Sequence, residues 1–104
     1  MTDEDFQKKI TGCHLILTYF SQPACTVCKT LRPKVEALVA GYQGLEFQYI
    51  DTITSPLLRG QYMIFTVPTI LLFYKGKEVR RWSRFLSVEE IKEELERYRQ
   101  EEPG

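Results

Sequence analysis

The sequence predicts an α/β fold in which a mixed four-stranded sheet is covered by helices on both faces. The segment His14–Phe20 is an almost unbroken apolar run, which is typical of a strand buried on both sides. Segments with the apolar periodicity of surface helices stand before and after it. Near the end of the chain, Lys75, Gly76 and Lys77 separate two strand-like segments as a hairpin turn does. The 104 residues are enough for a single domain, 1–104, and not for two.

The first half of the chain is expected to hold a helix, a strand and a second helix. Thr2 can cap the first helix, and Gly12 ends it. The buried strand His14–Phe20 follows. The second helix runs over about Cys25–Ala40 with its apolar residues facing inward. Pro33 inside this helix removes a backbone donor, so we expect the helix to be kinked there.

A strand and a short helix come next. Apolar and polar residues alternate over Leu45–Ile50, which predicts a second strand. Ser55 followed by Pro56 predicts the N-cap and the first position of a short helix that ends near Tyr62. Proline fits that first position because the N–H group it lacks would have no partner inside the helix.

The last third of the chain predicts a β-hairpin and a final helix. The hairpin joins a strand over Thr69–Tyr74 to a strand over Glu78–Trp82. Ser87 and Glu90 have the spacing of a capping box, which predicts the start of the final helix. The complete order of elements is therefore αβαβαββα.

Charge and composition exclude several classes of function. Fourteen lysines and arginines balance fourteen aspartates and glutamates, so no net field attracts a nucleic acid or a membrane surface. Basic residues gather in the hairpin, but alternation along the strand sends Arg80 and Arg81 to opposite faces. The apolar stretches are far too short to span a bilayer, and the acidic N-terminus is unlike a secretory signal. We therefore expect a monomeric, cytoplasmic protein that binds neither nucleic acid nor membrane.

Two of the three cysteines, Cys25 and Cys28, stand at the expected start of the second helix. Side chains three residues apart on a helix have Cβ atoms about 5–6 Å apart, against ~3.5–4.5 Å in a disulfide, so a small adjustment joins them. Unpaired amides and the helix dipole favour an anion at the helix start, which lowers the pKa of Cys25. Cys28 lies one turn deeper and can attack a mixed disulfide from within. The spacing therefore predicts an attacking thiol and a resolving thiol.

A structural zinc site is the alternative interpretation of this pair. Such a site needs four ligands, and the other soft candidates are Cys13 and His14. They stand at the opposite end of the buried strand, ~20 Å from Cys25 at about 3.3 Å per residue. Within one chain the four side chains cannot share a metal ion, so redox chemistry is favoured over zinc unless a site bridges two chains.

Together with these cysteines, three further features make the chain resemble the thioredoxin family over nearly its whole length. Pro33 stands five residues after Cys28, where members of the family carry a helix-kinking proline. Val67-Pro68 resembles the cis-proline loop of the family. The segment Thr69–Lys77 is similar to the hairpin that follows this loop.

The resemblance implies a thiol–disulfide oxidoreductase that takes part in electron transport without a bound cofactor. Its working group is the redox-active disulfide Cys25–Cys28, in which Cys25 is the nucleophile and Cys28 the resolving cysteine, with Pro68 packed beside Cys25. The substrate is then a disulfide in another protein or a small molecule. The electrons come from a separate reductase, a flavoenzyme that uses NADPH. The implied substrate groove is lined by Ala24, Ile50, Thr66, Val67, Pro68, Arg84 and Phe85.

The chain departs from the family pattern in the groove. It starts almost at the first helix, without the family's additional first strand. Ala24 stands where the family has a tryptophan, and Thr26-Val27 replaces the Gly-Pro between the cysteines. A glycine that lines the groove corresponds to Arg84. Arg84 could place a cation near Cys25, or it could be an ordinary solvated arginine.

The chain also departs from the family pattern beneath the cysteines. The family's buried acid, which helps to deprotonate the resolving cysteine, corresponds to Tyr19, and the lysine associated with that acid corresponds to Phe47. Resolution by Cys28 then needs water or a substrate group as the base. The alternative function is a binding module that keeps the fold and the groove but has lost turnover.

Overall fold

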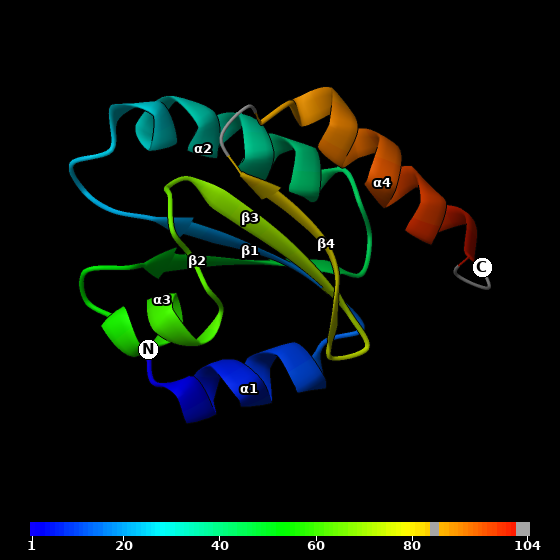
Figure 1. The fold of residues 1–104 in the computed structure, drawn as a ribbon. Coiled ribbons are helices and arrows are strands. Elements are labelled where there is room, and N and C mark those ends of the chain that lie inside the picture. Colours follow the sequence, from blue (N-terminus) through cyan, green and yellow to red (C-terminus); the bar gives the residue numbers. More distant parts are fainter. Residues whose placement is uncertain (84–85, 102–104) are drawn as a thin grey trace.

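The computed structural model describes residues 1–83 and 86–101, with side chains for residues 1–83 and 86–98. It confirms the α/β fold and the order αβαβαββα, with a mixed sheet of four strands between two pairs of helices (Figure 1). The elements are α1 (Asp3–Gly12), β1 (Leu15–Ser21), α2 (Thr26–Ala40), β2 (Leu45–Asp51), α3 (Pro56–Gln61), β3 (Thr69–Tyr74), β4 (Lys77–Ser83) and α4 (Val88–Glu101). No helix in these two ranges is long and apolar enough to cross a membrane.

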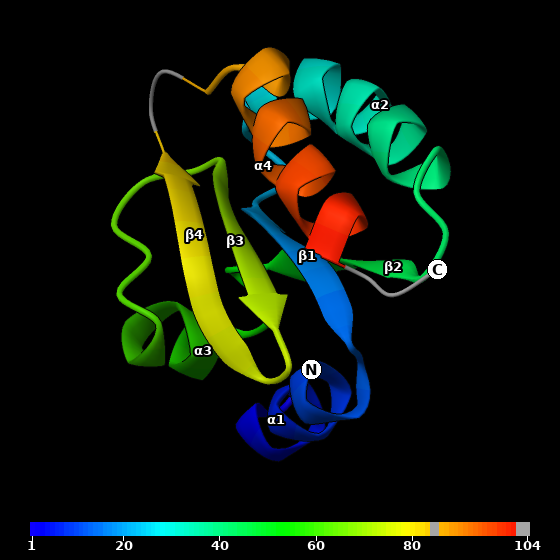
Figure 2. The ribbon, with the colours of Figure 1, turned by 90° about the vertical axis from the view of Figure 1, so that its right-hand side faces the viewer.

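The helices cover both faces of the sheet, α2 and α4 on one side and α1 and α3 on the other (Figure 2). Two groups of buried residues fill the space between these layers. The α2/α4 core consists of Leu15, Leu17, Tyr19, Cys28, Val35, Val39, Ile70, Leu72, Trp82, Ile91 and Leu95. The α1/α3 core consists of Phe6, Ile10, Ile16, Phe20, Ile50, Leu58, Ile64, Leu71 and Phe73.

Strand β1 is central in the sheet, whose order is β2-β1-β3-β4. It pairs in parallel with β2 and antiparallel with β3, and all of its residues are buried. Leu17 and Tyr19 enter the α2/α4 core, whereas Ile16 and Phe20 enter the α1/α3 core. The unbroken apolar run follows from this position, because side chains on both faces of β1 meet a layer of helices.

The N-terminal ends of two helices differ in detail from the expectation. Helix α2 begins at Thr26, with Cys25 as its N-cap residue, and continues through Pro33 to Ala40 as one helix. Ser55 occupies the N-cap position of α3, but its side chain caps no backbone N–H. Its hydroxyl instead accepts a hydrogen bond of 3.0 Å from the ammonium group of Met1.

The hairpin between β3 and β4 follows the prediction. Lys75 and Gly76 both have positive φ, 52° and 84°, as the two-residue turns that suit the twist of a hairpin require. The two arginines of β4 lie on opposite faces of the sheet. Arg80 approaches Glu94 of α4 at 3.7 Å, whereas Arg81 donates hydrogen bonds to the chain just after α3. Within the described part of the hairpin, up to Ser83, the basic residues therefore form no continuous stripe.

Candidate active site

Cys25 and Cys28 form a disulfide at the start of α2, with their Cα atoms 5.2 Å apart. Cys25 is the N-cap residue of the helix and is half-buried. Cys28 lies in the first turn, belongs to the α2/α4 core and is 2% exposed. Because Cys25 borders the surface and Cys28 is buried, another thiol can approach Cys25 but not Cys28.

The start of α2 favours negative charge on Cys25. The backbone N–H of Cys28 donates to Cys25 Sγ at 3.2 Å, so the sulfur occupies the position of a capping oxygen. The first turn of α2 is described in full and contains no acidic residue that would oppose an anion. After reduction the same amide and the helix dipole stabilise a thiolate, which is the nucleophilic form of cysteine.

Tyr19 of β1 contacts the first turn of α2 at Cys28. Its hydroxyl donates a hydrogen bond of 2.8 Å to the backbone carbonyl of Cys28, and its side chain is fully buried. Burial raises the pKa of Tyr19 to about 12, and the nearby Tyr49 contributes to the same increase. The phenol therefore keeps its proton at physiological pH and cannot take one from Cys28.

Aromatic side chains surround Tyr19 in the space between α2 and β2. The rings of Phe47 and Tyr49 each lie 6.1 Å from the Tyr19 ring, and Tyr49 is stacked on it. The guanidinium carbon of Arg32 is 3.9 Å from the centre of the Tyr49 ring, and the Arg32 guanidinium also pairs with Glu36 at 2.6 Å. An aromatic cluster with an exposed cation on its rim thus underlies the disulfide.

The loop before β3 lies close to the start of α2 (Figure 1). Its Val67–Pro68 peptide bond is cis, Pro68 is buried, and Val67 is half-buried. The hydroxyl of Thr69 donates to the carbonyl of Thr66 at 2.6 Å and closes the loop. Cys25 and Val67 both pack against the α2/α4 core, so the fold brings the disulfide and the cis-proline loop together.

The remaining residues of the predicted groove have different surroundings. Ala24 is exposed beside Cys25, and Thr66 is half-buried next to Val67. Ile50 is 2% exposed and belongs to the α1/α3 core, so its side chain lies beneath the surface. Arg84 and Phe85, the other two groove positions, lie outside the described residues.

The residues considered for zinc lie away from the disulfide. Cys13 is a free, half-buried thiol that packs against the α1/α3 core, on the opposite side of the sheet from Cys28. The ring of His14 makes an edge contact with Tyr74 at 5.0 Å. Within residues 1–83 and 86–101, no three His, Cys, Asp or Glu side chains are grouped so as to hold a metal ion.

Three features of the site were not predicted from the sequence. One is the hydrogen bond from Tyr19 to the Cys28 carbonyl, and another is the position of Arg32 over Tyr49. The third is the exposure of two apolar side chains, Val27 at 64% between the cysteines and Phe65 at 81% in the loop before β3. The only signal for the third was the place of these residues in the chain, beside the cysteines and just before Val67.

Comparison with known proteins places the chain among thioredoxins. The family model described as Thioredoxin matches residues 1–97. A thioredoxin-like protein of Bacillus subtilis (strain 168), YdfQ, is 29% identical over 103 residues, which cover 86% of this chain and 92% of that protein. The structure of thioredoxin 1 from Thermosipho africanus TCF52B is 32% identical with a TM-score of 0.77, covering 82% of this chain and 94% of that one. The thioredoxin of Fasciola hepatica is 30% identical with a TM-score of 0.84, covering 92% and 93%.

Proposed function

Because the chain belongs to the thioredoxin family, we propose that it reduces disulfides in other proteins with the dithiol form of Cys25 and Cys28. One observation carries the proposal. The two cysteines form a disulfide at a helix start, and Cys25 is half-buried whereas Cys28 is 2% exposed. This asymmetry assigns the roles, since the accessible thiol attacks and the buried thiol resolves.

The reaction transfers two electrons from the dithiol to the substrate. The Cys25 thiolate attacks one sulfur of the substrate disulfide, the substrate S–S bond breaks, and the first substrate sulfur leaves as a thiolate that takes up a proton. Cys28 then loses its proton and attacks the Cys25 sulfur of the mixed disulfide. The second substrate sulfur leaves and is protonated, and the Cys25–Cys28 disulfide remains.

The proton of Cys28 has to leave a buried position. Tyr19 holds the Cys28 carbonyl but, with a pKa of about 12, cannot act as the base. Water, or the substrate thiolate formed in the first step, is then the acceptor. We expect resolution to be the slow step and the mixed disulfide to be long-lived.

The substrate binds as an extended segment against the cis-proline loop. The main chain of Val67, in the loop that packs with Cys25 against the α2/α4 core, pairs with the main chain of the substrate. Ala24 and Thr66 border this segment, with Ile50 in the core beneath it. By the family pattern, Arg84 and Phe85 complete the rim.

The protein works without a bound cofactor and as a monomer in the cytoplasm. Its disulfide is returned to the dithiol by a separate reductase, which we propose is a flavoenzyme that takes electrons from NADPH. An equilibrium reduction potential near about −270 mV would suit that donor, whereas about −200 mV would suit exchange with a glutathione-like pool. Trapping free thiols across a graded thiol/disulfide buffer measures this potential.

Reduction of insulin, followed with dithiothreitol as the electron source, tests the proposal. We expect Cys25→Ser to abolish the catalysed rate. Reduced Cys28→Ser, mixed with insulin after the dithiothreitol has been removed, should accumulate a mixed disulfide that is visible as a mass adduct. Cys13→Ser is the matched control, because this third thiol packs against the α1/α3 core away from the site. Thiol-independent binding of insulin with no catalysed reduction would refute the proposal and support the binding module instead.

A further inference from the structure

A pocket of about 310 Å³ lies next to the cis-proline loop. One wall comes from the loop after α3 and the other from the ends of β3 and β4. Its lining residues in the sheet alternate with those of the α2/α4 core, so the pocket opens on the face that α1 and α3 cover. The lining consists of Met63, Phe65, Thr66, Thr69, Arg81 and Ser83.

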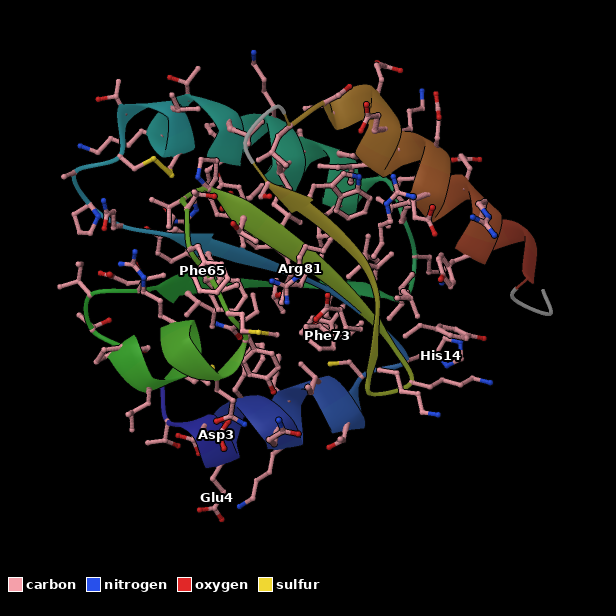
Figure 3. All side chains as sticks on the ribbon, in the orientation of Figure 1. Asp3, Glu4, His14, Phe65, Phe73 and Arg81 are labelled. Atoms are coloured by element: carbon pink, nitrogen blue, oxygen red, sulfur yellow. A yellow bond between two sulfur atoms is a disulfide. The ribbon has the colours of Figure 1, made fainter. Side chains whose placement is uncertain are left out.

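Arg81 fixes the loop wall of the pocket. Its guanidinium donates to the carbonyls of Tyr62 and Met63 at 2.9 and 3.1 Å, and it also pairs with Glu78 at 2.9 Å. These bonds tie the chain after α3 to β4, and Figure 3 shows Phe65 and Arg81 from the two walls. Because the walls are already joined, a ligand does not have to order them.

The chemistry of the lining favours an apolar ligand group. The positive charge of Arg81 is balanced by Glu78, and the Thr69 hydroxyl is used by the Thr66 carbonyl. The side chains of Phe65 and Met63 are 81% and 58% exposed and offer apolar surface at the pocket. An aromatic or large aliphatic side chain would cover this surface, whereas a carboxylate would meet an arginine that is already paired.

The pocket is continuous with the segment that pairs with substrate. Thr66 and Phe65 directly precede Val67, and consecutive Cα atoms are about 4 Å apart. In an extended peptide, side chains on one face repeat about every 7 Å. A residue about two positions from the attacked cysteine can therefore reach the pocket while the main chain pairs with Val67.

From this geometry we infer that the pocket is a specificity site, which binds an apolar, preferably aromatic, side chain of the substrate near its reactive cysteine. The inference rests on the proposed function for the position of the substrate. It adds a class of substrate: disulfides whose cysteine is flanked by an aromatic residue.

Peptide disulfides test the inference. Dimers of a short Gly/Ser peptide with one cysteine would carry phenylalanine, alanine or glutamate two residues before or after that cysteine. We expect kcat/KM for one phenylalanine peptide to exceed that of its alanine counterpart by about tenfold, the usual discrimination of an apolar pocket. Equal values for phenylalanine and alanine, or a preference for glutamate, would overturn the inference.

Variants locate the effect in the pocket. Phe65→Ala should reduce the phenylalanine-to-alanine ratio to about twofold or less. Turnover of bis(2-hydroxyethyl) disulfide, which has no side chain to place, measures the thiol chemistry of each variant separately from that ratio. Leu57→Ala is the matched control, because Leu57 is another exposed apolar residue, at 78%, and lies in α3 outside the pocket lining. A ratio that Phe65→Ala leaves intact would contradict the assignment.

The small disulfide also separates this inference from the proposed function. If bis(2-hydroxyethyl) disulfide is reduced and the peptides show no preference, only the specificity site is refuted. If no disulfide is reduced, the proposed function fails, and peptides with serine in place of cysteine still test the pocket. The phenylalanine peptide should then shift the NMR signals of Phe65, Arg81 and Ser83 more than the alanine peptide does, and equal shifts would refute the site.

Discussion

Removing the Tyr19 hydroxyl tests how much its hydrogen bond to the first turn of α2 contributes to stability. The hydroxyl donates to the Cys28 carbonyl at 2.8 Å, and both residues are buried, so water cannot take over the lost bond. Because the Cys28 carbonyl lies within α2 and also accepts in the helical pattern, the loss is the net value of one hydrogen bond, about 0.5–1.5 kcal/mol. The Phe ring keeps the packing, so we expect Tyr19→Phe to lower the free energy of unfolding by about 1 kcal/mol. In a domain of this size, each 1 kcal/mol corresponds to about 4–8 °C in Tm.

Urea unfolding of the oxidised protein, followed by circular dichroism, measures this loss. Tyr49→Phe is the matched control, because it removes a hydroxyl from the same aromatic cluster, and no hydrogen bond of that hydroxyl is seen among the described residues. We expect the control to change the stability by less than about 0.5 kcal/mol. Equal losses in the two variants, or none in Tyr19→Phe, would refute the argument that the bond anchors the turn.

Three other perturbations have defined outcomes. Burial raises the pKa of Tyr19 to about 12, so the unfolded chain releases this proton first as the pH rises above about 10. Between pH 10 and 12, the free energy of unfolding of the wild type should therefore fall by up to about 3 kcal/mol more than that of Tyr19→Phe, as measured in paired urea titrations. Arg81→Lys keeps the charge but loses the planar guanidinium, which donates to the carbonyls of Tyr62 and Met63. Amide hydrogen exchange at Met63 and Ile64 should therefore accelerate, whereas exchange in β1 should not change. Gly76→Ala should lower Tm by the equivalent of about 1 kcal/mol, because φ at this position is +84°, whereas Gly12→Ala in the helical α1 should not.

The elements of this fold could be predicted because each has a local signal. The apolar run of β1, the two residues of the hairpin turn and the capping box of α4 depend on neighbours in the chain. The structure places their boundaries within a residue or two of the expectation: β1, for example, is Leu15–Ser21 instead of His14–Phe20. The antiparallel pairing of β1 with β3, in contrast, joins distant segments and was not predicted from the sequence.

The site could be predicted only where its residues form a motif. Cys25, Cys28 and Pro68 stand in short signatures, and the chemistry of a helix start follows from general principles. The bond from Tyr19 to Cys28 joins residues of different elements and depends on how closely β1 and α2 pack. The pairing of Arg81 with the end of α3 spans eighteen positions of the chain, and no local pattern indicates it. Tertiary contacts of this kind require coordinates.

Strand β4 lies at one edge of the sheet, and its irregular pairing with β3 has a consequence for aggregation. Its register against β3 shifts between Leu72 and Phe73, and it carries Lys77, Arg80 and Arg81. A shifted register twists the free edge, and charged side chains resist the approach of a second strand, which are two ways in which natural sheets avoid joining edge to edge. Strand β4 thus discourages extended chains from pairing along this edge, so that concentrated solutions should resist the growth of intermolecular β-structure.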